Sequence, residues 1–91
     1  MLTEQYESNG DATEIIAILD EEWNAIAAEA KQQGASPNPD WRSHLSIEQG
    51  RGSAVSSILF TFATTAAYDL FKEHILPRIV ARLGRAFKRS D

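Results

Sequence analysis

The segment Gly52–Tyr68, with the sequence GSAVSSILFTFATTAAY, contains no charged residue. Two periodic patterns overlap within it. One is the alternation of Ile58, Phe60 and Phe62, which is typical of a strand. The other has a helical period over sixteen residues and consists of Val55, Leu59, Phe62, Ala66 and Leu70. Because the helical match is the longer one, the pattern predicts a helix over residues 53–75.

A helix without charges has two interpretations. It is either the core helix of a soluble bundle, surrounded by neighbouring helices, or a segment in a bilayer with the following basic residues on the cytoplasmic side. Six of the seventeen residues from Gly52 to Tyr68 are Ser or Thr, and Asp69 follows directly. A membrane span needs about 20 predominantly apolar residues. We therefore favour the soluble bundle and keep membrane association as the alternative.

Size and composition restrict the classes of protein. The 91 residues are enough for one domain, but its core is small, so we expect a second copy to complete it in a homo-oligomer. The chain has no cysteine, and His44 and His74 lie far apart in the sequence, so we expect no metal and no other cofactor. The chain does not begin with a basic region followed by an apolar core, so we expect no secretory signal. A cytoplasmic location is the expectation, with the inner face of a membrane as the alternative.

The first third of the chain predicts one long helix. Residues 1–10 are polar and are expected to form a flexible leader, followed by a single helical domain over residues 11–91. Asp11 and Glu14 have the spacing of a capping box, and Gly34 is typical of a helix end, so a helix is predicted over residues 12–33. Its apolar positions, spaced by four and three residues, are Ala12, Ile16, Leu19, Trp23, Ile26 and Ala30.

Two shorter helices complete the predicted fold. A linker helix is expected over residues 39–48, after a rigid proline-containing connection. A basic amphipathic helix is expected over residues 77–89, beginning at Pro77. The predicted fold class is all-α, a small helical bundle built on an antiparallel hairpin of the two long helices, with the linker helix and the basic C-terminal helix packed beside it.

Charge is distributed unevenly along the chain. Residues 1–50 contain ten acidic and two basic residues, a net charge of −8, and residues 51–91 contain three acidic and seven basic residues, a net charge of +4. Such asymmetry is typical of proteins that interact through opposite charges. The predicted partner-binding residues are the acidic residues of the first helix, a tryptophan of the linker helix and the arginines of the last helix: Glu14, Glu21, Glu22, Glu29, Trp41, Arg78, Arg82, Arg85 and Arg89.

The arginines of the last helix are expected to face away from the first helix. At about 100° per residue, their line lies roughly 130° from the apolar line of the same helix. Side chains that meet across an apolar seam lie beside it, which these do not. We therefore expect them to contact another molecule or water.

These features favour a non-enzymatic helical protein–protein interaction module that acts through charged helix faces: an adaptor, an accessory subunit, or an inhibitor or immunity-type protein. The alternative is a small membrane-associated protein, with helix 53–75 inserted or interfacial and the basic C-terminal segment on anionic headgroups. Nucleic acid is disfavoured as a partner, because the net charge is −4 and no nucleic-acid-binding motif is present. No enzyme is expected, since Asp40, His44 and Ser46 do not share one helical face and no oxyanion site is evident.

Overall fold

The computed structural model describes residues 2–8, 11–50, 56–84 and 87–89. Helix α1 (Ala12–Gln32) follows the first strand, and a second helix lies between the third and fourth strands. One antiparallel sheet contains four strands, β1 (Leu2–Ser8), β2 (Leu45–Gln49), β3 (Ser56–Phe62) and β4 (Lys88–Arg89). Their spatial order is β2-β3-β1-β4, which is the order of a ferredoxin-like arrangement. The fold is thus α+β, and the predicted all-α bundle is wrong.

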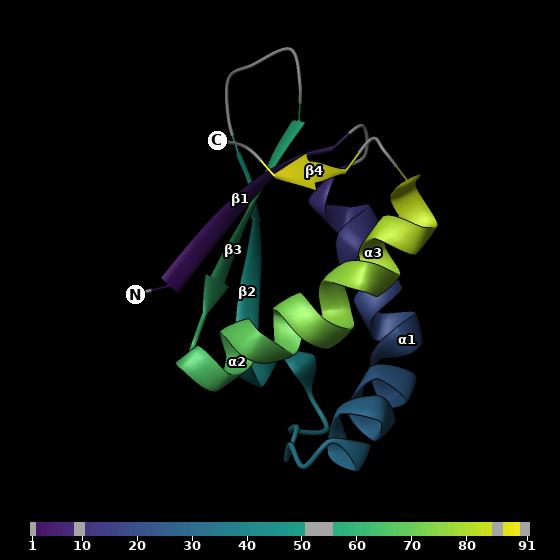
Figure 1. The fold of residues 1–91 in the computed structure, drawn as a ribbon. Helices are drawn as coiled ribbons and strands as arrows, with labels where there is room; N and C mark the ends of the chain where they lie inside the picture. Colours follow the sequence, from purple (N-terminus) through teal and green to yellow (C-terminus); the bar gives the residue numbers. More distant parts are fainter. Residues whose placement is uncertain (1, 9–10, 51–55, 85–86, 90–91) are drawn as a thin grey trace.

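Both helices lie on the same side of the sheet (Figure 1). Side chains alternate along the inner strands, so that Glu4, Tyr6, Ile58 and Phe60 are buried beneath the helices. The residues between them, such as Gln5, point to the opposite face. The aromatic side chains of the described strand residues, Tyr6, Phe60 and Phe62, all point to the helix-covered face.

The predicted helix over residues 53–75 is wrong in its first half. Residues 56–62 form β3, which pairs with β1 on one side and β2 on the other, and residues 53–55 lie outside the described residues. Strand partners on both sides satisfy the backbone of this segment, and the alternation of Ile58, Phe60 and Phe62 places these side chains on the helix-covered face. Helical structure starts only after Thr64, whose side chain accepts a hydrogen bond from the Ala67 N–H at 3.0 Å. The predicted hairpin of two long helices is therefore absent.

Residues 2–8 form an inner strand rather than part of a flexible leader. β1 pairs with β3 over its whole length and with β4 at Tyr6 and Glu7. Its side chains alternate between the core and the open face. Because polar residues such as Glu4 occupy core positions, the sequence does not show the alternation of apolar and polar residues that marks a strand. The flexible leader was expected from the polar composition of residues 1–10, and that composition does not reveal the strand.

The second helix has three parts without a break between them: α2 (Thr65–Leu70), a π-helical turn, η2 (Phe71–Ile75), and α3 (Leu76–Leu83). Pro77 explains the π-helical turn, because proline lacks an N–H and its ring clashes with the carbonyl four residues earlier in a regular α-helix. The wider turn avoids that conflict. In it, the Leu76 N–H donates to the Phe71 carbonyl, five residues earlier.

The predicted C-terminal helix over residues 77–89 ends early. α3 stops before Gly84, which has a positive φ of 67°, and the chain returns to the sheet as β4. Phe87 is buried, and its ring stacks on that of Tyr6 with 4.7 Å between centroids. This contact brings the end of the chain beside β1.

The predicted linker helix over residues 39–48 is also wrong. A single 3-10 turn, η1 (Trp41–Ser43), is capped by Asp40, whose carboxylate accepts from the Arg42 N–H. The chain then enters β2 at Leu45, where the side chains alternate in exposure. Because β3 is available as a partner, the segment pairs as a strand.

The helix predicted over residues 12–33 is confirmed as α1. The Asp11 carboxylate accepts from the Glu14 N–H at 3.3 Å, as expected of the N-cap. Gly34 has a φ of 92° just beyond the helix end. Most of the predicted apolar stripe is buried against the sheet, including Leu19, Trp23, Ile26 and Ala30.

No helix in the described part of the chain combines the length and the apolar character that crossing a bilayer requires. The helix that the membrane alternative places over residues 53–75 is not formed, because residues 56–62 are a strand inside the sheet.

Candidate functional site

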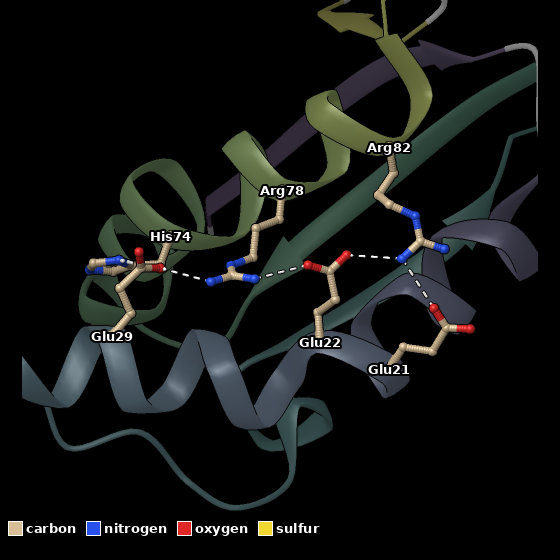
Figure 2. A network of polar contacts seen from close by, with 6 residues as sticks. All are labelled: Glu21, Glu22, Glu29, His74, Arg78 and Arg82. Atoms are coloured by element: carbon tan, nitrogen blue, oxygen red, sulfur yellow. Dashed lines mark hydrogen bonds and ion pairs between the residues drawn. The ribbon is translucent and has the colours of Figure 1, made fainter.

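A charge network joins α1 to the second helix (Figure 2). We call it the helix–helix network, and its members are Glu21, Glu22, Glu29, His74, Arg78 and Arg82. Arg78 donates to Glu22 at 2.9 Å and to Glu29 at 3.5 Å. Arg82 donates to Glu22 and to Glu21, each at 3.1 Å. The buried ring of His74 lies with its Nδ1 3.8 Å from Glu29.

This network corrects the expected direction of the arginines. Arg78 and Arg82 reach α1, because both helices lie on one face of the sheet and their polar flanks meet. The hydrogen bond from Arg78 is the main cause of a pKa of Glu22 below its ordinary value. The Nε of Arg78 is buried and has no hydrogen-bond partner among the described residues. The guanidinium groups of Arg78 and Arg82, which were expected to contact an outside partner, thus already donate hydrogen bonds within the chain.

The other predicted partner-binding residues lie in separate places. Glu14 is exposed in the first turn of α1. Arg89, in β4, pairs with Glu4 at 3.2 Å, and Arg85 lies outside the described residues. The structure therefore does not gather the acidic and basic residues into two open faces.

Trp41 lies in the core, and its side chain is buried rather than presented at the surface. Its indole N–H donates to the Asp20 carboxylate at 2.8 Å, and Arg42 donates to the same oxygen at 3.2 Å. The guanidinium of Arg42 also lies over the Trp41 ring, 4.3 Å from its centroid. The Trp41 hydrogen bond, followed by that of Arg42, lowers the pKa of Asp20. Trp41 and Arg42 thus hold the start of β2 against α1.

A buried carboxylate lies beneath β1. The Glu4 side chain accepts hydrogen bonds from the hydroxyls of Tyr6 at 2.5 Å and Tyr68 at 2.8 Å. Lys72 lies 3.8 Å and Arg89 3.2 Å from the same carboxylate. We call these five residues the Glu4 cluster. They come from β1, α2, η2 and β4, so one carboxylate joins two strands of the sheet to the second helix.

The environment of Glu4 keeps it ionised. Burial by itself raises the pKa of the carboxyl, but the two tyrosine hydroxyls and the positive charges of Lys72 and Arg89 together bring it below its ordinary value. Burial and the hydrogen bond to Glu4 raise the pKa of Tyr6. A carboxylate that stays ionised and fully hydrogen-bonded is a poor general acid and a weak general base at neutral pH. The cluster is suited to holding elements together.

Sequence reasoning did not find Glu4. The signal that could have found it is the spacing of Glu4, Tyr6 and Ser8, which places all three on one face of a strand. That signal has meaning only once residues 2–8 are recognised as a strand, and their partners in β3 lie far away in the sequence.

A hollow of about 720 Å³ opens at one end of the sheet, where β1 and β2 begin and β3 ends. We call it the sheet-end hollow. It is lined by Leu2, Arg42, Leu45, Ser46, Thr61, Phe62, Ala63, Thr64 and Thr65. Its walls therefore combine apolar side chains, hydroxyl groups and the guanidinium of Arg42, and they come from the ends of β1, β2 and β3, from η1 and from the start of α2.

The described residues give the hollow no pair of acid and base groups. Its lining contains no carboxylate, histidine or lysine. The nearby His44 accepts a hydrogen bond from the Asn38 N–H through Nε2 at 2.8 Å, and burial lowers its pKa. Among the described residues, no group of three or more histidine or carboxylate side chains could hold a metal ion.

Comparison with known proteins yields no relative. No protein-family model, no curated protein and no solved structure matches this chain. Its function must therefore be inferred from its own geometry.

Proposed function

We propose that the chain is a non-enzymatic protein–protein interaction module that binds its partner at the sheet-end hollow. The observation that carries this proposal is the mixed lining of the hollow, in which Leu2, Leu45 and Phe62 lie beside hydroxyl groups and the Arg42 guanidinium, which is 54% exposed although one of its nitrogens bonds to Asp20. Protein interfaces combine an apolar centre with polar groups around it. The partner would insert an apolar side chain and form hydrogen bonds around it.

The openness of the hollow favours a protein over a small molecule. Leu2 at its edge is 40% exposed, which makes it one of two exposed large apolar side chains among the described residues. Sites for small molecules usually enclose most of the ligand. A hollow with an exposed apolar edge instead suits a side chain presented by a protein surface.

The hollow replaces the charged helix faces as the proposed binding surface. Arg78 and Arg82 form hydrogen bonds within the chain, so binding through them would first require those contacts to break. The negative charge of the N-terminal half would influence how fast a partner associates more than how tightly it binds. The absence of an acid–base pair in the hollow's described lining supports binding rather than catalysis.

The test uses Ala63, an exposed residue in the lining of the hollow. Peptides that bind the wild-type protein would be selected from a random display library, and their affinities measured for Ala63→Trp, which fills the hollow, and for Ala63→Ser as the matched control. We expect at least about tenfold weaker binding to Ala63→Trp, equivalent to about 1.4 kcal/mol, and unchanged binding to Ala63→Ser. Failure to select any peptide, or equal binding to both variants, would contradict the proposal.

A further inference from the structure

The outer edge of β2 presents backbone groups that the described chain does not pair. β2 is the end strand of the sheet. The Gly50 N–H donates to the Ser57 carbonyl, and the Ala63 N–H donates to the His44 carbonyl. Backbone groups of even-numbered residues therefore point toward β3, and those of Leu45 and Ile47 point outward.

The side chains of this edge offer little protection against strand pairing. Leu45–Gln49 contains no proline, lysine or arginine, which commonly block an exposed edge, and its one charged residue is Glu48, on the face opposite the helices. Ile47 packs against the core on the helix-covered face but is only partly buried. A strand added beside β2 would cover the rest of this side chain.

A second copy of β2 fits this edge in one particular register. In an antiparallel pair centred on Ile47, the two isoleucines lie opposite each other, and Leu45 lies opposite Gln49 of the second copy. Glu48 then lies opposite Ser46, so no carboxylate directly faces another. All five residues of β2 take part in this register.

Neighbouring registers are less favourable. Centring the pair on Glu48 places the two Glu48 carboxylates directly opposite each other, which is destabilising. Centring it on Ser46 leaves Glu48 and Gln49 beyond the end of the other copy's strand. A shift of one strand by an odd number of residues is excluded, because it would place side chains of the core-facing set on the opposite face of the sheet.

We propose that β2 is the dimerisation edge of this protein, and that two copies join their β2 strands antiparallel about Ile47 into one continuous sheet. Each copy meets the other with the same residues, as a two-fold axis requires. The outward N–H and carbonyl of Ile47 bond to those of Ile47 in the second copy. Dimerisation at this edge does not depend on a partner in the sheet-end hollow.

The first test measures the register directly. Because the chain has no cysteine, single cysteines can be introduced as Ser46→Cys in one preparation and Glu48→Cys in another. Opposite residues of a non-hydrogen-bonded antiparallel pair have Cα atoms about 4.5 Å apart, which is within disulfide range. We expect the oxidised mixture to give a disulfide-linked dimer with one copy of each variant, and either variant alone to give little.

Thr61→Cys is the matched control, because Thr61 lies opposite Ser46 on the inner strand β3 and not at the edge. It should give no linked dimer when mixed with Glu48→Cys. Equal linking of every variant, or a linked dimer of Ser46→Cys alone, would overturn the register. A wild-type protein that sediments as a monomer at all concentrations up to the millimolar range would overturn the dimer itself.

The second test uses Ile47→Pro. The Ile47 N–H points outward, so proline there leaves the pairing with β3 intact, as is observed for proline in edge strands. The change removes two hydrogen bonds at the dimer axis, and we expect the dissociation constant measured by sedimentation to rise about thirtyfold, with an unchanged circular dichroism spectrum. Unchanged dimerisation would overturn the proposal. Peptide binding sensitive to Ala63→Trp would persist in either case, which separates this test from that of the proposed function.

Discussion

The Glu4 cluster and the helix–helix network are both charge networks, but they lie in different environments. Glu4 has 2% of its side chain exposed and sits between the sheet and the second helix. In the helix–helix network, the side chains of Glu21 and Arg82 are 62% and 47% exposed. Water can therefore replace the partners in the second network far more readily than in the first.

This difference shows which contacts specify the arrangement of the fold. Exposed ion pairs contribute little to stability individually, because water and salt screen them. A buried carboxylate must keep its partners, since the cost of leaving it unpaired is several kcal/mol. We therefore expect Glu4 to determine how β1, β4 and the second helix are placed, and the helix–helix network to adjust the packing of two helices that apolar contacts already hold.

Replacement of Glu4 should have the largest effect. Glu4→Ala leaves the buried Tyr6 hydroxyl without its acceptor and Lys72 and Arg89 without their counter-charge, and we expect a loss of about 3 kcal/mol in the free energy of unfolding. Chemical denaturation would measure it. Glu7→Ala, on the opposite face of the same strand, is the matched control and should change stability by about 0.5 kcal/mol or less. Similar losses for both variants would contradict the role of the cluster.

Acid should destabilise the wild-type protein partly through Glu4. The pKa of Glu4 in the folded protein lies below its ordinary value of 4.5, so its contribution is complete above that value and is lost as the pH falls through the lowered pKa. Glu4→Gln should therefore show a smaller loss of stability than wild type between neutral pH and pH values below 4.5. Denaturation curves at several pH values would measure this, and parallel curves for the two proteins would contradict it.

Glu22→Gln provides the comparison within the helix–helix network. The pKa of Glu22 is also lowered, mainly by Arg78, so this variant should also lose less stability in acid than wild type. Because Glu22 is more exposed than Glu4, we expect the difference from wild type to be smaller. A larger effect at Glu22 would reverse the comparison between the two regions.

Loss of Arg78 should have an intermediate effect. Arg78→Met keeps most of the apolar length of the side chain and removes the hydrogen bonds to Glu22 and Glu29. Its side chain is 30% exposed, so we expect a loss of about 1–2 kcal/mol. Thermal and chemical unfolding would measure this loss. A loss as large as that of Glu4→Ala would contradict the view that the helix–helix network only adjusts the packing of the two helices.

Arg82→Met should have the smallest effect. Arg82 is more exposed than Arg78, and salt should screen its pairs with Glu21 and Glu22. We expect a smaller shift of the thermal midpoint than for Arg78→Met, and no difference from wild type in about 1 M salt, where the Debye length is about 3 Å. A shift that persists in high salt would argue against a screened surface pair.

The sequence alone was sufficient for α1, because its signals are local. Asp11, Glu14 and Gly34 mark the helix ends within the segment itself, and the apolar stripe repeats many times between them. The segment after Gly52 differs. Its strand signal covers only Ile58, Phe60 and Phe62, and a strand is decided by partners that lie far away in the sequence.

The same reason explains why the candidate sites were missed. The Glu4 cluster and the sheet-end hollow combine residues from β1 with residues from the second half of the chain. The charged residues Arg78, Glu22 and Glu29 were identified as important, but their pairing depends on both helices covering one sheet face, which no local pattern contains.

The position of residues 2–8 as an inner strand is the claim on which the Glu4 cluster, the sheet-end hollow and the order of the sheet depend. Even-numbered residues of β3 point their backbone groups toward β1, so the amide protons of Glu4 and Tyr6 should be hydrogen-bonded to that strand. Amide hydrogen exchange measured residue by residue tests this most directly. We predict slow exchange at Glu4 and Tyr6, close to the rate of global unfolding, whereas rapid exchange throughout residues 2–8 would contradict an inner strand.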